Sequence, residues 1–172
     1  LYPKIRIKFL LENKFLELEK NIAHIAIRPG KKPEELNYIS KSLRKIKTGL
    51  YASKSYLKKY GKFKDETDLG GHHFITTSSQ LSHIPIVKWM SANIPSENIL
   101  FETNLFSDIA TSVITGQAIG PLLEREAALH DSLVNVVPSK KQWQNNLFVV
   151  YHMNLRSNLK IQTFTEFMVK NF

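Results

Sequence analysis

Cysteine is absent from the 172 residues of the chain. Disulfide bonds, thiolate metal sites, iron–sulfur clusters and cysteine nucleophiles are therefore excluded. Long apolar runs are missing too, since no stretch approaches the roughly 18–20 residues that a membrane-spanning helix needs. Glycine and proline number only seven each, which is too few for a fibrous or low-complexity chain. The remaining possibility is a globular chain of one domain or two small lobes.

Motifs of catalysis are absent as well. The chain has no nucleophile elbow, no His-Glu-x-x-His zinc motif, no P-loop and no glycine-rich dinucleotide fingerprint. The segment 116–120 lacks the glycine spacing of that fingerprint, and we interpret it as a turn that ends a helix. His72 and His73 are adjacent, so in an extended segment they point to opposite faces and cannot share a metal ion. We therefore expect no enzyme activity, no cofactor and no metal site.

Basic residues are concentrated in the first third of the sequence. The net charge is +9, and residues 1–64 hold 17 basic but only 5 acidic side chains. A basic half could contact nucleic acid or an anionic ligand. Of the 24 basic residues, however, only five are arginine, which is the residue that reads bases and clamps phosphates best. We interpret the lysines as solvated surface.

Apolar periodicity predicts strands that alternate with helices, which favours α/β lobes built on a mostly parallel sheet. The expected strands or extended segments are 5–11, 22–27, 36–46, 50–52, 73–77, 99–101, 133–137 and 147–151. The expected helices are 53–60, begun by Ser53 and ended by Gly61, then 84–92, 107–116 with Ser107 as N-cap, 122–130 and 159–172. The run 22–27 is apolar at nearly every position, so we expect it to be buried on both faces, with His24 hydrogen-bonded in the core.

Ligands of open α/β sheets bind beyond the carboxyl ends of the strands. Asn13, Arg28, Thr76, Thr77 and Asn104 lie at or just past such ends. The guanidinium of Arg28 suits a carboxylate-bearing ligand. An ordinary surface or lobe-bridging salt bridge is an equal alternative for this residue.

Ser78 extends the hydroxyl cluster of Thr76 and Thr77, together with the backbone N–H groups of the same loop. These groups could bind a polar ligand. A loop that is merely rich in serine and threonine is the alternative interpretation.

Several segments, read in order, resemble one protein family. They are 21–28 (Asn-Ile-Ala-His-Ile-Ala-Ile-Arg), 50–61 (Leu-Tyr-Ala-Ser-x-x-Tyr-Leu-x-x-x-Gly), 68–75 (Asp-Leu-x-x-His-x-Phe-Ile), and near the end His152, Leu155-Arg156 and Ile161-x-x-Phe164-x-x-Phe167. In this order and spacing they resemble the effector-binding, or substrate-binding, domain of LysR-type transcriptional regulators. The resemblance covers nearly the whole chain.

The resemblance implies a type 2 periplasmic-binding-protein fold, in which two crossover strands join two α/β lobes. Residues 1–46 plus 151–172 would form the first lobe and residues 47–150 the second. A small effector, which Arg28 suggests is anionic, would bind in the cleft between them. Asn13, Arg28 and the loop 76–78 would face that cleft.

By the same resemblance, the intact protein would be a cytoplasmic homo-oligomer without membrane contact. It would bind DNA only through an N-terminal winged helix-turn-helix domain that this chain lacks. A free-standing solute-binding protein of the same fold, serving a transporter, is the alternative.

The chain departs from the family pattern at three positions. His24 replaces the usual Asp of the second strand, Ala118 replaces the second Gly of a turn, and Leu123 stands where a Pro is usual. The resemblance also implies that the first strand and helix of the domain precede this sequence, which begins at the Tyr-Pro that normally follows them. We therefore expect a destabilised first lobe and a better ordered second lobe.

The chain is predicted not to recognise DNA specifically, because it lacks a helix-turn-helix and its basic residues are mostly lysine. Any binding to DNA should be electrostatic and should weaken steeply with salt. Footprinting at physiological salt measures this directly. A protected, sequence-specific site would contradict the prediction.

Overall fold

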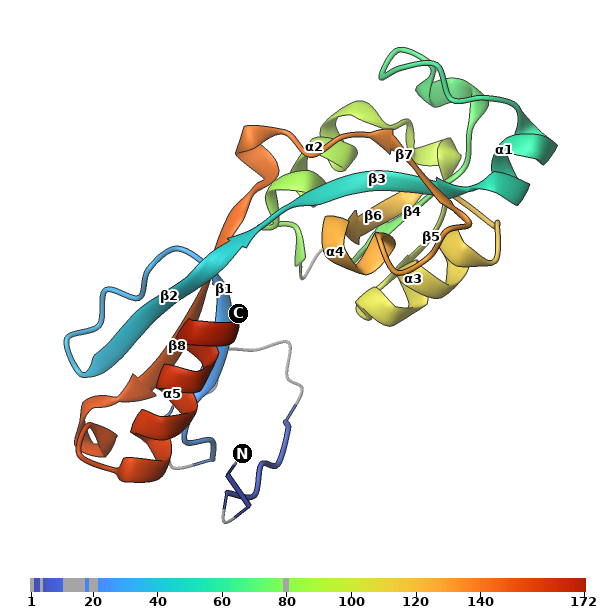
Figure 1. The fold of residues 1–172 in the computed structure, drawn as a ribbon. Helices are drawn as coiled ribbons and strands as arrows, with labels where there is room; N and C mark the ends of the chain where they lie inside the picture. Colours follow the sequence, from blue (N-terminus) through green and yellow to red (C-terminus); the bar gives the residue numbers. More distant parts are fainter. Residues whose placement is uncertain (1, 4, 11–17, 19–21, 79–80) are drawn as a thin grey trace. The chain divides into compact units, whose positions relative to one another are not determined.

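The computed structural model describes residues 2–3, 5–10, 18, 22–78 and 81–172. The chain divides into two compact units (Figure 1). Unit 1 comprises Leu1–Lys45 and Asn145–Phe172, and unit 2 comprises Ile46–Gln144. The chain passes between the units twice, at residues 45–46 and 144–145.

Unit 1 contains a three-stranded sheet in the order β1-β8-β2, formed by β1 (Ala26–Gly30), β8 (Asn145–His152) and β2 (Tyr38–Ile46). Strands β1 and β8 are antiparallel, with Ala26 opposite Val150. A short 3-10 turn, η6 (Met153–Leu155), leads to helix α5 (Leu159–Asn171). Asn158 caps α5 by accepting hydrogen bonds from two backbone N–H groups of its first turn. The expected strand 147–151 and helix 159–172 are thus confirmed.

The core of unit 1 is small. Leu18, Phe148 and Val150 are buried together, and Tyr38 packs against them. Helix α5 buries Ile161, Thr165 and Met168, three positions on one helical face.

Two expectations for unit 1 are wrong. The described part of the expected strand 5–11, residues 5–10, forms no strand, and Phe9 is 78% exposed. The run 22–27 is not buried either: Ile22 is 55% exposed, His24 is exposed, and the strand begins only at Ala26. Apolar alternation produces a buried strand only beside a hydrogen-bonded neighbour and under a second layer. Among the described residues, β1 has one neighbour, β8, and residues 5–10 have none.

Unit 2 has β3 (Thr48–Ser53) at the centre of a sheet in the order β6-β3-β7, with β6 (Gly120–Leu123) and β7 (Leu133–Val137). Both outer strands are antiparallel to β3. Strands β4 (Phe74–Thr77) and β5 (Ile99–Thr103) form a parallel pair, and Phe74 makes a parallel bridge to Ile119. The expected strands over 50–52, 73–77, 99–101 and 133–137 are confirmed.

The expectation of a mostly parallel sheet is wrong, because β1 pairs antiparallel with β8 and β3 pairs antiparallel with both β6 and β7, whereas β4, β5 and that bridge are parallel. A sequence in which strands alternate with helices predicts sheets covered by helices. It does not predict whether β3 and β8 run parallel or antiparallel to the strands beside them. The chain passes between the units at the end of β2 and just before β8. Strand β8 pairs antiparallel with β1, and β3 pairs antiparallel with β6 and β7.

The helical elements of unit 2 are α1 (Lys54–Tyr60), η2 (Leu69–Gly71), α2 (Pro85–Asn93), η4 (Ser96–Asn98), α3 (Phe106–Ile114), α4 (Glu124–Ala127) and η5 (Lys141–Trp143). Helix α1 has the expected ends: the Ser53 hydroxyl accepts from the Tyr56 N–H at 3.1 Å, and Gly61 stops the helix at φ +94°.

Two of the expected helices in unit 2 differ from the structure. Helix α3 starts after Leu105 rather than Ser107. The expected helix 122–130 is replaced by the end of β6 and the single turn α4, because Leu122 and Leu123 pair with β3 instead.

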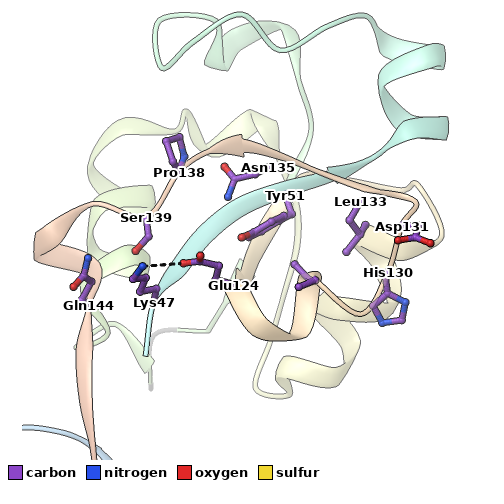
Figure 2. Close-up of a pocket in the computed structure, with 12 residues that line it drawn as sticks. Lys47, Tyr51, Glu124, His130, Asp131, Leu133, Asn135, Pro138, Ser139 and Gln144 are labelled. Carbon is purple, nitrogen blue, oxygen red and sulfur yellow. Dashed lines mark ion pairs between the residues drawn. The ribbon is translucent and has the colours of Figure 1, made fainter. Parts of the chain in front are cut away.

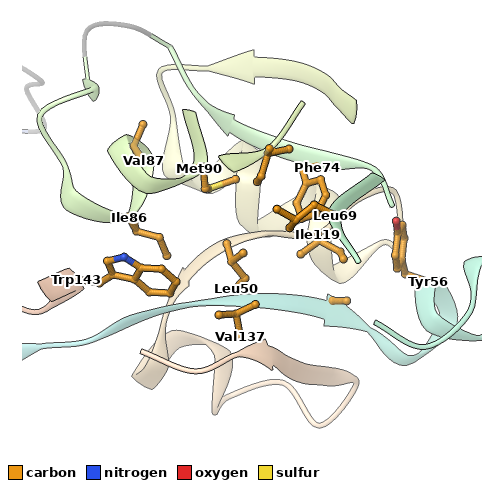
Figure 3. Close-up of a cluster of buried hydrophobic side chains, with 12 residues drawn as sticks. Leu50, Tyr56, Leu69, Phe74, Ile86, Val87, Met90, Ile119, Val137 and Trp143 are labelled. Carbon is orange, nitrogen blue, oxygen red and sulfur yellow. The ribbon is translucent and has the colours of Figure 1, made fainter. Parts of the chain in front are cut away.

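Strand β4 separates two hydrophobic clusters. Phe74 belongs to the cluster that β3 and α2 enclose with Leu50, Met90 and Trp143 (Figure 3). Ile75, the next residue, belongs to the opposite cluster with Ile109 and Val113 of α3. Side chains alternate between faces along a strand, so one short strand anchors both clusters.

The side chain of Lys140 joins the segment before β8 to other parts of unit 2. The Lys140 ammonium lies 4.9 Å from the ring centroid of Trp89 and 5.0 Å from that of Trp143, and it pairs with the carboxylate of Glu66. Both contacts are of the kind that a cation makes with an aromatic face. We call these four residues the Lys140 clamp. It joins α2, the loop after α1 and the last segment of unit 2.

Substituting Gly120 by Ala is predicted to lower the local free energy of unfolding by about 1–3 kcal/mol. A Cβ atom there would lie 2.9 Å from methyl groups of Ile75 and Val113, and both are buried. Native-state hydrogen exchange of the β4 and α3 amides measures the change. Gly70→Ala is the control, because nothing lies within 4 Å of its added Cβ. Equal protection in both variants would contradict the prediction.

Candidate functional site

Four of the predicted site residues come together where β4 and β5 end. Thr77 lies opposite Thr103 in the parallel register, and the Ser78 N–H donates to the Thr103 carbonyl at 3.0 Å. The Ser78 hydroxyl donates to the side-chain oxygen of Asn104. Thr76, Thr77, Ser78 and Asn104 therefore share one edge of the parallel pair, which is where α/β proteins bind ligands.

The two threonines of this edge face opposite sides of β4. Thr76 points to the α2 side, where its hydroxyl lies 3.8 Å from the Met90 sulfur. Thr77 is on the same side as Ile75, toward α3, and is only 3% exposed. The Thr77 hydroxyl is buried and has no hydrogen-bond partner among the described residues. A buried hydroxyl without a partner costs about 1–3 kcal/mol.

The end of β5 and the start of α3 add two residues to this edge, Thr103 and Asp108, that were not predicted from the sequence. The Thr103 hydroxyl donates to the Asp108 carboxylate at 2.8 Å and accepts from the Leu105 N–H at 3.1 Å. Asp108 lies in the first turn of α3, where a negative charge is favourable. The sequence contains an Asp five residues after the strand end. The expected N-cap at Ser107 placed the start of the helix too late for this Asp to be assigned a contact with Thr103. The edge thus combines neutral hydroxyl and amide groups with one carboxylate.

The other predicted site residues belong to unit 1. Arg28 lies in β1 opposite Phe148, and its guanidinium carbon is 5.4 Å from the ring centroid of Tyr38. Arg28 is half-buried. Asn13 lies outside the residues that the structure describes.

Unit 2 also contains a cavity of about 680 Å³ (Figure 2). Its lining residues are Lys47, Tyr51, Glu124, Ala127, Ala128, His130, Asp131, Leu133, Asn135, Pro138, Ser139 and Gln144. Lys47 and Glu124 form an ion pair at 3.7 Å. Burial raises the pKa of Tyr51, partly offset by a hydrogen bond with Asn135. None of the predicted site residues that the structure describes lines this cavity.

The adjacent histidines both contact the Tyr56 hydroxyl. His72 is buried, with Nδ1 at 3.3 Å from the Tyr56 hydroxyl and Nε2 at 3.6 Å from the Asp68 carboxylate. The His73 N–H donates to the same hydroxyl at 2.8 Å. Over the described part of the chain, no three His, Asp or Glu side chains gather as a metal site would require. The described helices include none that is both long and apolar enough to cross a membrane.

The whole chain matches a known protein family. The sequence model of the LysR substrate binding domain covers residues 1–172. The chain therefore belongs to the LysR substrate-binding domain family. No curated protein sequence matches the chain.

Solved structures of this family share the fold at low sequence identity. The regulatory domain of CrgA from Neisseria meningitidis superposes with a TM-score of 0.82 at 18% identity, over 98% of this chain and 85% of that one. The AphB regulatory domain from Vibrio vulnificus gives 0.73 at 18%, over 99% and 86%. The AmpR effector binding domain from Citrobacter freundii gives 0.72 at 9%, over 98% and 84%. The fold is thus the type 2 periplasmic-binding-protein fold of LysR-type regulatory domains.

Substituting Thr77 by Val is predicted to raise the free energy of unfolding by about 1 kcal/mol, because the change removes a buried hydroxyl that has no partner. Thermal unfolding followed by far-UV circular dichroism measures it. Thr76→Val is the matched control, and it should change stability by about 0.5 kcal/mol or less, since its hydroxyl contacts only a sulfur atom. A loss of stability in Thr77→Val alone would show that its hydroxyl has a partner within the fold.

Proposed function

We propose that the chain is the effector-sensing part of a LysR-type transcriptional regulator, with a small molecule bound at the edge formed by Thr76, Thr77, Ser78 and Asn104. The observation that carries the proposal is the Thr77 hydroxyl. It is buried and without a partner among the described residues, at the strand edge where this fold class binds ligands. A bound effector would supply the missing hydrogen bond and recover its cost.

The chemistry of the edge suggests the orientation of the effector. Thr77 offers a hydroxyl without a partner among the described residues, and the Ser78 hydroxyl, which donates to Asn104, can still accept a hydrogen bond. Asp108 would repel an anion at the start of α3. Within the proposal, Arg28 and Asn13 of the first lobe complete the site. An anionic group of the effector would then pair with Arg28, and its uncharged polar groups would meet Thr77 and Ser78.

The proposed lobes are residues 1–46 plus 151–172 and residues 47–150, with the effector between them. Its binding would shift the lobes, and the shift would reorient DNA-binding domains in a cytoplasmic homo-oligomer. The domain would act by binding alone, without catalysis. The chain spans 59% of a longer CrgA structure, so the DNA-binding domain of the intact regulator is part of the proposal.

The gene supplies one test of this assignment. A helix-turn-helix encoded in frame directly upstream of these residues supports a regulator. A secretion signal in that place would assign the chain to solute transport instead and overturn the proposal.

Substituting Arg28 by Met is predicted to raise the dissociation constant of an anionic effector about 10–150-fold, through the loss of charged hydrogen bonds worth about 1.5–3 kcal/mol. The effector is first sought with a panel of small mono- and dicarboxylates, by the rise in melting temperature of the chain that binding causes. Isothermal titration calorimetry then gives the dissociation constants. Arg156→Met is the control, because Arg156 is exposed and carries the same charge.

The proposed site fails if Arg28→Met and Arg156→Met bind the effector equally well. It fails equally if the effector binds to Thr77→Val as tightly as to the unsubstituted chain.

A further inference from the structure

Four lysines form an exposed basic surface on and after α1. Lys54, Lys58 and Lys59 lie in the helix, Lys62 follows it, and all four are exposed. Figure 1 shows α1 at one end of unit 2. The surrounding sequence, residues 36–64, holds nine basic side chains and no acidic one. We call these four residues the α1 lysine surface.

The first lysine of this surface is placed against the electrostatics of its own helix. Lys54 lies in the first turn of α1, where the helix dipole favours an acidic side chain, and that turn contains none. Lys54 and Lys58 are four residues apart, so two like charges are neighbours on one face and repel each other. Lys58 and Lys59 lie in the last turn, where the dipole favours a cation, so the conflict is confined to Lys54 and its repulsion with Lys58. Such local conflicts are typical of functional surfaces.

The acidic side chains that follow these lysines in the sequence are engaged elsewhere. Asp65 accepts hydrogen bonds from Thr67, which lower its pKa more than the nearby Lys64 does. Glu66 pairs with Lys140, and Asp68 lies 3.6 Å from His72. Among the described residues, none of the four lysines forms an ion pair, and Lys59 contacts only the ring of Tyr60, at 4.7 Å. Their charge is therefore left for a partner.

We propose that the α1 lysine surface binds the phosphate backbone of duplex DNA without reading its sequence. Lysine suits this partner, since an ammonium meets a phosphate as a point charge, whereas base recognition favours the planar fork of arginine. The inference goes beyond the proposed function, in which a separate domain recognises DNA. The contact would matter biologically only if the proposed function holds. A DNA-binding domain in the same protein would raise the effective concentration of DNA near this surface and so strengthen a weak contact.

The test is the binding of the 172-residue chain to a fluorescein-labelled duplex of arbitrary sequence, measured by fluorescence anisotropy between 25 and 200 mM NaCl. Two to four phosphate contacts predict a slope of about −2 to −4 in a plot of log affinity against log salt concentration. Exchanging the duplex for one of a different sequence should leave the affinity unchanged within about twofold.

A variant with Lys54, Lys58, Lys59 and Lys62 replaced by Gln is expected to bind at least tenfold more weakly at the lowest salt, with a slope near zero. Gln keeps a good helix propensity, and removing like charges does not destabilise α1. The matched control replaces Lys31, Lys32, Lys160 and Lys170 by Gln, which removes the same charge from exposed positions outside α1. The control should retain most of the affinity.

An equal loss in both variants would assign the binding to net charge and overturn the proposal. So would the absence of DNA binding at the lowest salt. Tighter binding of polyglutamate than of DNA at matched charge concentration would assign the surface to an acidic protein partner and overturn the DNA proposal. Effector binding is measured separately with the carboxylate panel, so failure here and failure of the proposed function remain distinguishable.

Discussion

Burial of β4 on both faces is the constraint on which unit 2 depends. All four residues of this strand are buried. Phe74 packs into one hydrophobic cluster and Ile75 into the other, so the strand is fixed between two layers of side chains. Full burial of a large apolar side chain contributes roughly 1.5–3 kcal/mol. This fixed position places the Thr77 hydroxyl at the end of the strand, where no other part of the described fold satisfies it.

Local signals predicted the elements of unit 2 well because they act over a few residues. Ser53 and Gly61 specify both ends of α1 through a side-chain hydrogen bond and a positive φ, and neither depends on the rest of the fold. The predictions that were wrong concern segments whose conformation depends on whether another strand is there to pair with them. Leu122 and Leu123 fit a helical pattern equally well, but β3 offers them a strand to pair with. Ile22 and Phe9 show the reverse case, since their apolar patterns found no partner among the described residues.

The proximity of four candidate residues was predictable from the sequence, but their different environments were not. The rule that ligands bind at strand ends selects Thr76, Thr77, Ser78 and Asn104 from the sequence, and the structure brings them to one edge. The different roles of the two threonines depend on which face of β4 each occupies, and this follows only from the packing against Met90 and α3. The contact of Thr103 with Asp108 likewise needed the true start of α3.

The Lys140 clamp has an optical consequence. The chain contains only two tryptophans, and both indoles belong to the clamp, with ring centroids 5.1 Å apart. Tryptophan fluorescence excited at the red edge of the indole absorption band therefore comes from one place, the segment just before β8 and the part of α2 packed against it. Release of the ammonium from the two rings would change the quantum yield and emission maximum there. Unit 1 contributes no tryptophan to that signal, so a change in emission records an event at the end of unit 2 where the chain leaves it.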